Sequence, residues 1–239
     1  YFISDRPDKD FRFGGRIHST SDVGINGYSE EEPCCPMGNT HGGLVELNGR
    51  YYIFDHRHTN HSSFCRQGVA EQVTIDAQGR ITQAEATSCG LNDGWLAGRG
   101  IYPAYIACVL YYEKTVAKEG RTACITQDGG DRECLPGQYI RGISDGCIVG
   151  YRYFEGQALQ SIRLKVRGKA KGTLYVTCHE EGGKTQEPQE NAVGSSVCDI
   201  GTNDWEMLTI PVQIPAGVYP LYFRFRGEGS LDLAEFTLE

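Results

Sequence analysis

Regular alternation of apolar and polar residues predicts β-strands over the second half of the chain. In SIRLKVRG, residues 161–168, Ile162, Leu164 and Val166 share one face and the basic residues between them share the other. A period of two residues is typical of a strand with one buried and one solvated face. Further segments of this kind follow at short spacing, namely GTLYVTC, WEMLTIPVQI, VYPLYFRFRG and SLDLAEFTLE. Strands at such spacing predict a β-sandwich.

The last of these segments contains a change of parity. Leu231 and Leu233 lie on one face, whereas Phe236 and Leu238 continue the apolar series on the other. We therefore predict a β-bulge between them, or a strand that is buried on both faces.

Two turn signals predict antiparallel hairpins in the first part of the chain. Asn48-Gly49 separates GGLVEL from an apolar-aromatic run, and both residues accept the positive φ that a type I′ turn demands. Gln78-Gly79 marks a second hairpin within VTIDAQGRITQAE. Residues 1–87 are therefore predicted to form antiparallel sheet, with a long polar excursion at 19–38.

Composition fits an all-β protein of short strands and tight turns, since 31 Gly and 14 Tyr stand against 2 Met. A chain of 239 residues is long enough for two ordinary domains. The Gly-rich segment SCGLNDGWLAGRGIYP reads as the connector between them. We predict a first domain at 1–100 and a second at 101–239.

Charge and hydropathy exclude two classes of partner. The formal net charge of −8, without a cluster of Lys and Arg, disfavours nucleic-acid binding. No apolar run approaches the roughly 18 residues that a membrane span needs, so we expect no membrane partner and a soluble protein. The compartment stays open between secreted and cytoplasmic in a bacterium. YFISDRP at the start reads as the end of a strand, so we expect further polypeptide before it.

The ten Cys residues are scattered without a compact framework, which favours reduced thiols over five disulfides. Cys34 and Cys35 are adjacent and are flanked by Pro33 and Pro36. A metal site at this pair would need further ligands that the spacing does not supply.

Three histidines, His56, His58 and His61, crowd into YYIFDHRHTNHSSFCR. They predict a metal site, a catalytic cluster or the polar end of a strand. On a strand, His56 and His58 face the same way and Arg57 faces the other. A metal would need a common focus about 2 Å from each ring, which this spacing does not guarantee. The end of a strand is the favoured interpretation.

GNTHGGLVELNGRYYIFDHRHTNHSSFCRQ resembles the region of the fourth and fifth blades in glycoside hydrolase family 43. These enzymes are five-bladed β-propellers that cleave arabinofuranosyl and xylosyl linkages in plant polysaccharides. YFISDRPDKDFRFGGRI resembles the close of the third blade, and the resemblance extends over roughly residues 1–107. It implies that the chain opens with part of a β-propeller, with His58 and His61 in the turn after the strand that ends at His56-Arg57.

The same resemblance implies three functional residues. His41 of GNTHG corresponds to the histidine that reaches the propeller axis and helps to hold a central ion, commonly calcium. The alternative for His41 is a loop histidine that bonds to backbone. Asn39 of the same motif and Arg66 of CRQ correspond to residues near the sugar subsite.

Activity in this family resembles inverting hydrolysis by a carboxylate base and a carboxylic acid roughly 6.5–9.5 Å apart. These groups sit in the first three blades, and none of Asp5, Asp8, Asp10 or Asp55 matches their motifs. We therefore assign no catalytic residue to this chain. We expect the missing N-terminal half of the propeller to be its partner, because an incomplete ring exposes apolar faces and strand edges.

Residues from about 108 onward resemble family 6 carbohydrate-binding modules, through CITQDGGDRE, QYIRGISDGCIVGYRYFEG and SLDLAEFTLE in that order. The resemblance implies a jelly-roll-like sandwich in which loop aromatics stack on a sugar. Gly142 occupies the position of one such aromatic. Trp205 is the candidate for the other, and its alternative role is a core residue at the start of a strand.

Three functions stay open at this point. The first is part of a glycoside hydrolase of α-L-arabinofuranosidase or β-xylosidase type, inactive by itself, whose substrate contains arabinose or xylose. The second is a non-catalytic carbohydrate-binding protein, and the third is a structural β-sandwich.

Overall fold

The computed structural model describes residues 1–113, 123–128, 137–179 and 188–239, and these residues form strands and two short 3-10 helices. The prediction of an all-β fold is confirmed. Cys134 and residues 129–133 of the CITQDGGDRE motif lie outside the described residues. Within the described part of the chain, no helix is long and apolar enough to cross a membrane.

The elements follow one another along the chain. Those of the first part are β1 (Phe2–Ile3), β2 (Arg12–Phe13), β3 (Gly43–Leu47), β4 (Arg50–Thr59) and β5 (Ser62–Val73). Those of the second part are β6 (Leu96–Ala97), β7 (Gly100–Pro103), η1 (Ala104–Ile106), β8 (Val109–Tyr112), β9 (Cys124–Asp128), β10 (Gly137–Ser144), β11 (Cys147–Gly156), β12 (Leu159–Thr177), η2 (Pro188–Glu190), β13 (Gly194–Ile214) and β14 (Gly217–Leu238).

The first part contains an antiparallel three-stranded sheet in the order β3-β4-β5. Leu47 pairs with Arg50 across the turn, in which Asn48 has φ 52° and Gly49 has φ 79°. Both residues take the left-handed conformation of a type I′ hairpin, as predicted. A propeller blade has four strands, so this sheet has one strand fewer than a complete blade.

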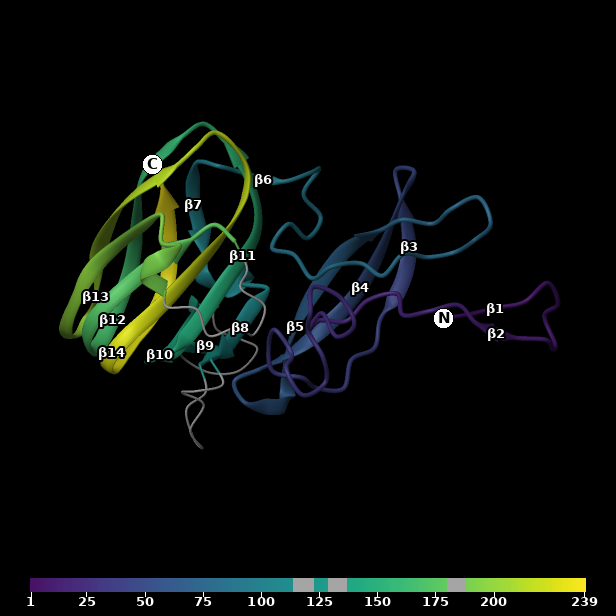
Figure 1. Cartoon of the computed structure of the whole chain (residues 1–239). Coiled ribbons are helices and arrows are strands. Elements are labelled where there is room, and N and C mark those ends of the chain that lie inside the picture. Colours follow the sequence, from purple (N-terminus) through teal and green to yellow (C-terminus); the bar gives the residue numbers. More distant parts are fainter. Residues whose placement is uncertain (114–122, 129–136, 180–187) are drawn as a thin grey trace.

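The second predicted hairpin is reduced to a turn. Ile75 and Ile81 form a single antiparallel bridge around Gly79, which has φ 74°. A separate hairpin, β1-β2, projects at the far end of the first part (Figure 1).

All strands from β6 onward belong to one hydrogen-bonded sheet that curls into the two layers of a sandwich (Figure 1). β14 pairs along one edge with β12. Along its other edge it pairs in succession with β11, β10 and β7. One long strand therefore contributes to both layers. β6 also joins this sheet, because it pairs with β11. The sandwich therefore begins at Leu96 in the sequence.

The alternation that predicted the sandwich holds at atomic level. Ile162, Leu164 and Val166 are buried, with exposures of 0%, 1% and 0%. The parity change in the last strand is a bulge, since Lys165 pairs with Glu235 and Val166 pairs with Leu233, which leaves Ala234 unpaired. Both predictions are confirmed.

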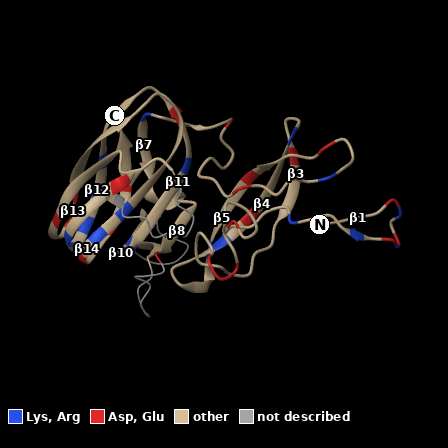
Figure 2. Ribbon diagram, viewed as in Figure 1, with Lys and Arg blue, Asp and Glu red and all other residues tan. Residues whose placement is uncertain are grey.

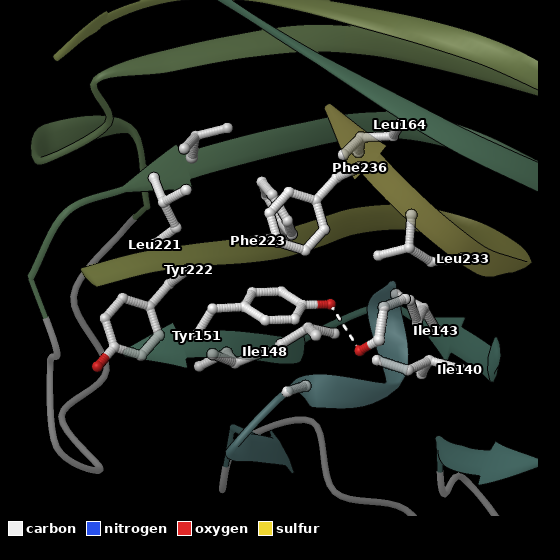
Figure 3. Packing of buried hydrophobic residues seen from close by; sticks show 14 of the residues in the cluster. Ile140, Ile143, Ile148, Tyr151, Leu164, Leu221, Tyr222, Phe223, Leu233 and Phe236 are labelled. Atoms are coloured by element: carbon white, nitrogen blue, oxygen red, sulfur yellow. Dashed lines mark hydrogen bonds between the residues drawn. The ribbon is translucent and has the colours of Figure 1, made fainter. Parts of the chain in front are cut away.

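The core of the sandwich is aromatic at its centre (Figure 3). The ring of Phe236 lies 4.5–6.0 Å, between centroids, from those of Tyr102, Tyr151, Phe154 and Phe223. Offset and edge-to-face contacts at these distances stabilise a core beyond the area that they bury. The Tyr151 hydroxyl donates to the Ala104 carbonyl oxygen at 3.0 Å, and the Tyr102 hydroxyl donates to that of Ala97 at 2.6 Å.

Buried hydrogen bonds join the first part to the sandwich. The Arg57 guanidinium of β4 donates to the carbonyl oxygens of Tyr105, at 2.7 Å, and Ala107. The backbone amide of Asn60, in the β4-β5 turn, donates to the carbonyl oxygen of Ile125 at 2.8 Å. The end of β4 is therefore fixed against η1 and β9.

The first part exposes large apolar side chains. All five residues of the edge strand β3 are exposed. The exposed fraction reaches 71% for Phe13 and 92% for Phe64. The other members are Phe2, Phe11, Leu44, Val45, Leu47, Tyr51 and Phe54. We refer to these nine side chains as the apolar face.

Candidate functional site

The segment that contains Asn39 and His41 is held against one face of β4 by two histidines. His56 Nε2 lies 3.0 Å from the Asn39 carbonyl oxygen, and its Nδ1 lies 3.2 Å from that of His41. His58 Nε2 lies 2.7 Å from the Asn39 side-chain oxygen. Because alternate residues of a strand face the same way, His56 and His58 act together on this segment. The histidine cluster is a positioning device for the Asn39–His41 loop.

Arg66 belongs to the same region of the sheet. It lies on β5 directly opposite His58 of β4, so its side chain shares a face with that histidine. Arg66 is exposed, and its Nε donates to the Ser63 carbonyl oxygen at 3.2 Å. The structure thus brings Asn39, His41 and Arg66 to one side of the β4-β5 hairpin, the side that the resemblance associates with sugar.

The prediction that both His58 and His61 lie in a turn is only half right. β4 continues to Thr59, so His58 lies in the strand, and the turn consists of Asn60 and His61. These two residues have φ values of 52° and 49°, which is the backbone of a tight hairpin. The strand is extended because Arg57 and His58 keep their cross-strand pairing with Gln67 and Arg66.

His41 does not form a metal site with the described residues. Its ring contacts that of His56 edge to face, with 4.5 Å between the centroids. No group of three or more His, Cys, Asp and Glu in the described part of the chain is placed to hold a metal ion. Calcium takes six to eight oxygen ligands. The residues present therefore do not make a calcium site on their own.

Asp55 lies on β4, and its side chain points to the face opposite that of His56 and the Asn39–His41 loop. Burial alone would raise its pKa, but the His18 side chain and the His56 amide, at 3.4 and 2.7 Å, outweigh burial and lower the pKa. A carboxyl group that stays ionised cannot serve as the general acid of a glycosidase. Asp5 and Asp8 lie in the exposed β1-β2 loop, beside arginines.

Trp205 lies in a second, separate cluster on the outer face of the sandwich. The guanidinium carbon of Arg167 is 4.3 Å from the centroid of Trp205 and 4.6 Å from that of Tyr139. The two rings meet edge to face at 5.5 Å. Arg167 also forms a bidentate ion pair with Asp128, at 3.1 and 3.2 Å. We refer to Tyr139, Arg167 and Trp205 as the aromatic cluster.

A bulge places Trp205 over Arg167. Val166 pairs with Glu206 and Gly168 pairs with Thr202, so residues 203–205 stand opposite Arg167 alone. The extra residues push the indole over the guanidinium. Trp205 is half-buried and lies inside β13. The alternative that it is a core residue at the start of a strand is therefore wrong.

Charged side chains surround this cluster. Figure 2 shows acidic and basic positions together on β12 and β14, where Arg167 Nε lies 3.1 Å from Asp232 and Lys165 Nζ lies 3.4 Å from Glu235. Arg167 and Tyr139 were not predicted as site residues. Their placement depends on pairing between strands far apart in sequence, and no local pattern signals it.

Gly142 lies where the resemblance would place a stacking aromatic. It has φ 80°, and its amide donates to the Asp232 carboxylate at 3.1 Å. Its carbonyl oxygen accepts from the Tyr112 hydroxyl at 2.9 Å. The left-handed backbone suits glycine and supports no aromatic side chain here.

A third polar group lies buried between the first part and the sandwich. Arg152 of β11 forms an ion pair with Asp22, and both side chains are fully buried. Arg152 also lies 3.2 Å from Glu85 and donates to the Tyr222 hydroxyl at 3.1 Å. Asp22 and Arg152 are 130 residues apart, so no motif in the sequence predicted the pair. We refer to this group as the junction cluster.

Glu71 lies beside the junction cluster. Burial raises its pKa to about 8, although hydrogen bonds from the Thr87 amide and hydroxyl, at 2.6 and 2.7 Å, act in the opposite direction. The negative charges of Asp22 and Glu85 raise it further. Glu71 is therefore protonated in the folded protein at neutral pH.

No protein-family model matches the chain. A curated xylosidase/arabinosidase of Thermoclostridium stercorarium is 40% identical over 247 residues, which take in 100% of this chain and 50% of the relative. The chain thus spans about half the length of the curated relative that it matches.

Solved structures also resemble the chain. A glycoside hydrolase family 43 arabinoxylan arabinofuranohydrolase from Bacillus subtilis, in complex with cellotetraose, matches with a TM-score of 0.54 and 16% identity. The match covers 100% of this chain and 46% of that one, so the two share a fold. A family 6 carbohydrate-binding module from Clostridium stercorarium, in complex with cellobiose, matches with a TM-score of 0.47 and 16% identity over 62% of this chain and 98% of that one.

Proposed function

We propose that this chain, a homologue over its whole length of one half of a xylosidase/arabinosidase, is part of a glycoside hydrolase that acts on plant cell-wall polysaccharide or oligosaccharide. The activity is of the α-L-arabinofuranosidase or β-xylosidase type, with inverting hydrolysis. The 40% identity to that relative is the observation that carries the proposal. The fold shared with the arabinoxylan arabinofuranohydrolase supports it.

In this proposal the chain supplies positioning and binding groups, and the catalytic carboxylates belong to the half of the enzyme that the chain does not cover. The pKa of Asp55 is lowered despite burial, because of His18 and the His56 amide, which does not suit a general acid, and Asp5 and Asp8 are paired with arginines. Asn39 and Arg66, on one side of the β4-β5 hairpin, are the substrate-binding candidates of the first part.

Co-expression tests whether the catalytic carboxylates belong to the half of the enzyme that this chain does not cover. This chain alone is expected to release no arabinose or xylose from arabinoxylan. Together with the half of the T. stercorarium relative that it does not cover, it is expected to release pentose, detected by reducing-sugar assay and chromatography. Hydrolysis by this chain alone, or none by the combined halves, would contradict the proposal.

The apolar face is the proposed docking surface for the remaining half of the propeller. β3 is an edge strand with free hydrogen-bonding groups on one side, and its side chains are exposed. A further strand of the same blade would pair that edge, and neighbouring blades would cover apolar side chains on the faces of the sheet.

A second candidate function, carbohydrate binding by the sandwich, is favoured by the aromatic cluster. An aromatic ring held by a cation is a rigid surface for the apolar face of a sugar, and Trp205 is held in this way by Arg167. Neighbouring charged groups such as Asp128 can accept hydrogen bonds from sugar hydroxyls.

Trp205→Ala tests this function. We expect the affinity for xylo- or arabino-oligosaccharides, measured by isothermal titration calorimetry, to fall by at least about tenfold, which corresponds to about 1.4 kcal/mol. Trp95→Ala is the matched control, because Trp95 is 46% exposed and its ring contacts Tyr153 outside the aromatic cluster. Unchanged affinity in Trp205→Ala, or an equal loss in both variants, would rule out stacking at Trp205.

The calcium role of His41 stays a prediction about the complete propeller. Among the described residues, no group of three or more His, Cys, Asp and Glu side chains accompanies His41. Chelation of divalent ions is expected to lower the Tm of the complete enzyme by a few degrees, and His41→Ala is expected to remove most of that response. A Tm that chelation leaves unchanged would exclude the role.

A further inference from the structure

A pocket of about 280 Å³ lies between the β4-β5 turn and the sandwich. The residues that line it include Cys35, Met37, Arg57 and Cys124. None of its lining residues in the described part of the chain is Asp or Glu, so the charge that faces it is positive. Cys35 lines this pocket, and 4% of its surface is exposed.

Cys35 forms a vicinal pair with Cys34, and both thiols are free. Cys35 Sγ donates to the Thr20 carbonyl oxygen at 2.9 Å and lies 3.5 Å from Ser21 Oγ. Cys34 Sγ points to the other side, toward the Cys108 carbonyl oxygen at 3.6 Å. Only Cys35 of the two faces the pocket.

The surroundings make the two thiols different in reactivity. The hydrogen bond from Cys34 lowers the pKa of Cys35 to about 7, burial opposes this, and Ser21 and the charge of Arg57 add to it. The same hydrogen bond and burial raise the pKa of Cys34. The Arg57 guanidinium is bonded to neutral acceptors, which are Gln67 and two carbonyl groups, so its charge is left to act on the thiol.

Other buried cysteines lack these features. Burial raises the pKa of Cys108 and of Cys147 to about 12, so both remain thiols. A thiolate is the nucleophile in thiol chemistry, and reactive cysteines sit beside cations in accessible sites. Cys35 lines a pocket together with Arg57, and its pKa is lowered to about 7, not raised as for the other two.

We propose that Cys34 and Cys35 are a redox-active vicinal dithiol that low-molecular-weight disulfides oxidise through this pocket. The Cys35 thiolate attacks one sulfur of the small disulfide, which forms a mixed disulfide and releases one thiolate. The Cys34 thiol then attacks Cys35 Sγ, transfers its proton to the leaving thiolate and closes a Cys34–Cys35 disulfide. Two protein thiols are oxidised and one small disulfide is reduced to two thiols, so atoms and electrons balance.

Oxidation at this position acts on the junction between the two parts of the chain. The Cys34 amide donates to the Ser21 carbonyl oxygen at 3.2 Å, and the Cys34 carbonyl oxygen accepts from the Leu110 amide at 2.7 Å. Drawing the two sulfurs into one bond removes them from Thr20 and Cys108. The oxidised form is therefore expected to be less stable than the reduced form.

Mass spectrometry after incubation with oxidised glutathione tests the proposal. Trypsin releases residues 17–50 as one peptide, in which Cys34 and Cys35 are the only cysteines. We expect this peptide to lose two hydrogens, without a glutathione adduct, and the Tm of the whole chain to fall by about 2–4 °C. Both changes should reverse on addition of dithiothreitol.

Single-cysteine variants distinguish the attacking role of Cys35 from the resolving role of Cys34. Cys34→Ser is expected to stop at the mixed disulfide, with one glutathione on the 17–50 peptide, and Cys35→Ser to form neither product. Cys124→Ser is the matched control, since Cys124 lines the same pocket, and should oxidise like the wild type. An unmodified 17–50 peptide in the wild-type chain would overturn the proposal without reference to any variant. A glutathione adduct confined to Cys124 would do the same.

Discussion

Arg152→Met is expected to destabilise the folded chain by about 3–5 kcal/mol. The substitution leaves the carboxylate of Asp22, which has no exposed surface, without its cation. Removing one partner of a buried ion pair carries a cost of this size, because the remaining charge cannot recover its hydration. Asp22 also accepts from the Ala86 amide at 2.8 Å, so its displacement would break the link from the loop at 19–28 to residue 86. Urea unfolding followed by fluorescence measures the change.

The matched control for this variant is Arg163→Met. Arg163 is also paired with a carboxylate, that of Glu239, but both side chains are 44% exposed. Exposed ion pairs contribute about 0–1 kcal/mol, so the control should unfold almost like the wild type. The double variant Arg152→Met/Asp22→Asn should be more stable than Arg152→Met alone, since it removes the fully buried, unpaired charge of Asp22. Equal costs at Arg152 and Arg163 would show that the junction cluster does not stabilise the fold.

Glu71→Gln is expected to remove a pH dependence of several kcal/mol from the free energy of unfolding. The pKa of Glu71 is raised from 4.5 to about 8 in the folded state, chiefly by burial. A group whose pKa is higher in the folded state than in the unfolded state contributes its full stabilisation at pH values below the unfolded-state pKa. The fold loses this contribution as the pH rises through the folded-state pKa. The wild type should therefore lose stability between about pH 4.5 and pH 8 relative to the Gln variant. The upper limit of the difference is about 5 kcal/mol, at 1.36 kcal/mol for each pKa unit.

Urea unfolding of both proteins at pH 5, 7 and 9 measures this difference directly, because the other titrating groups are common to both. Gln keeps an acceptor for the Thr87 amide, so the fold should be retained. Glu46→Gln, on the exposed strand β3, is the control and should follow the wild type at every pH. Parallel stability curves for the wild type and Glu71→Gln would contradict a proton on Glu71.

Residues near one another in sequence gave the most accurate predictions. The alternation at Ile162, Leu164 and Val166 and the parity change before Phe236 follow from the period of a strand, which depends only on the backbone. The Asn48-Gly49 hairpin follows from the φ values that these residues accept. Hairpin ends were less well predicted, since cross-strand pairing with β5 extends β4 as far as Thr59.

The sequence by itself therefore determined the all-β class, the main turns, the buried faces of the strands and the likeness of the Asn39–His41 loop to a sugar-processing family. Only the tertiary structure decided that Trp205 lies on Arg167, that Arg152 neutralises Asp22 and that Cys35 opens into a pocket. The physical reason is that strand period and turn conformation are set by neighbouring residues. Ion pairs, ring contacts and cavities form between residues up to 130 positions apart, which only packing brings together.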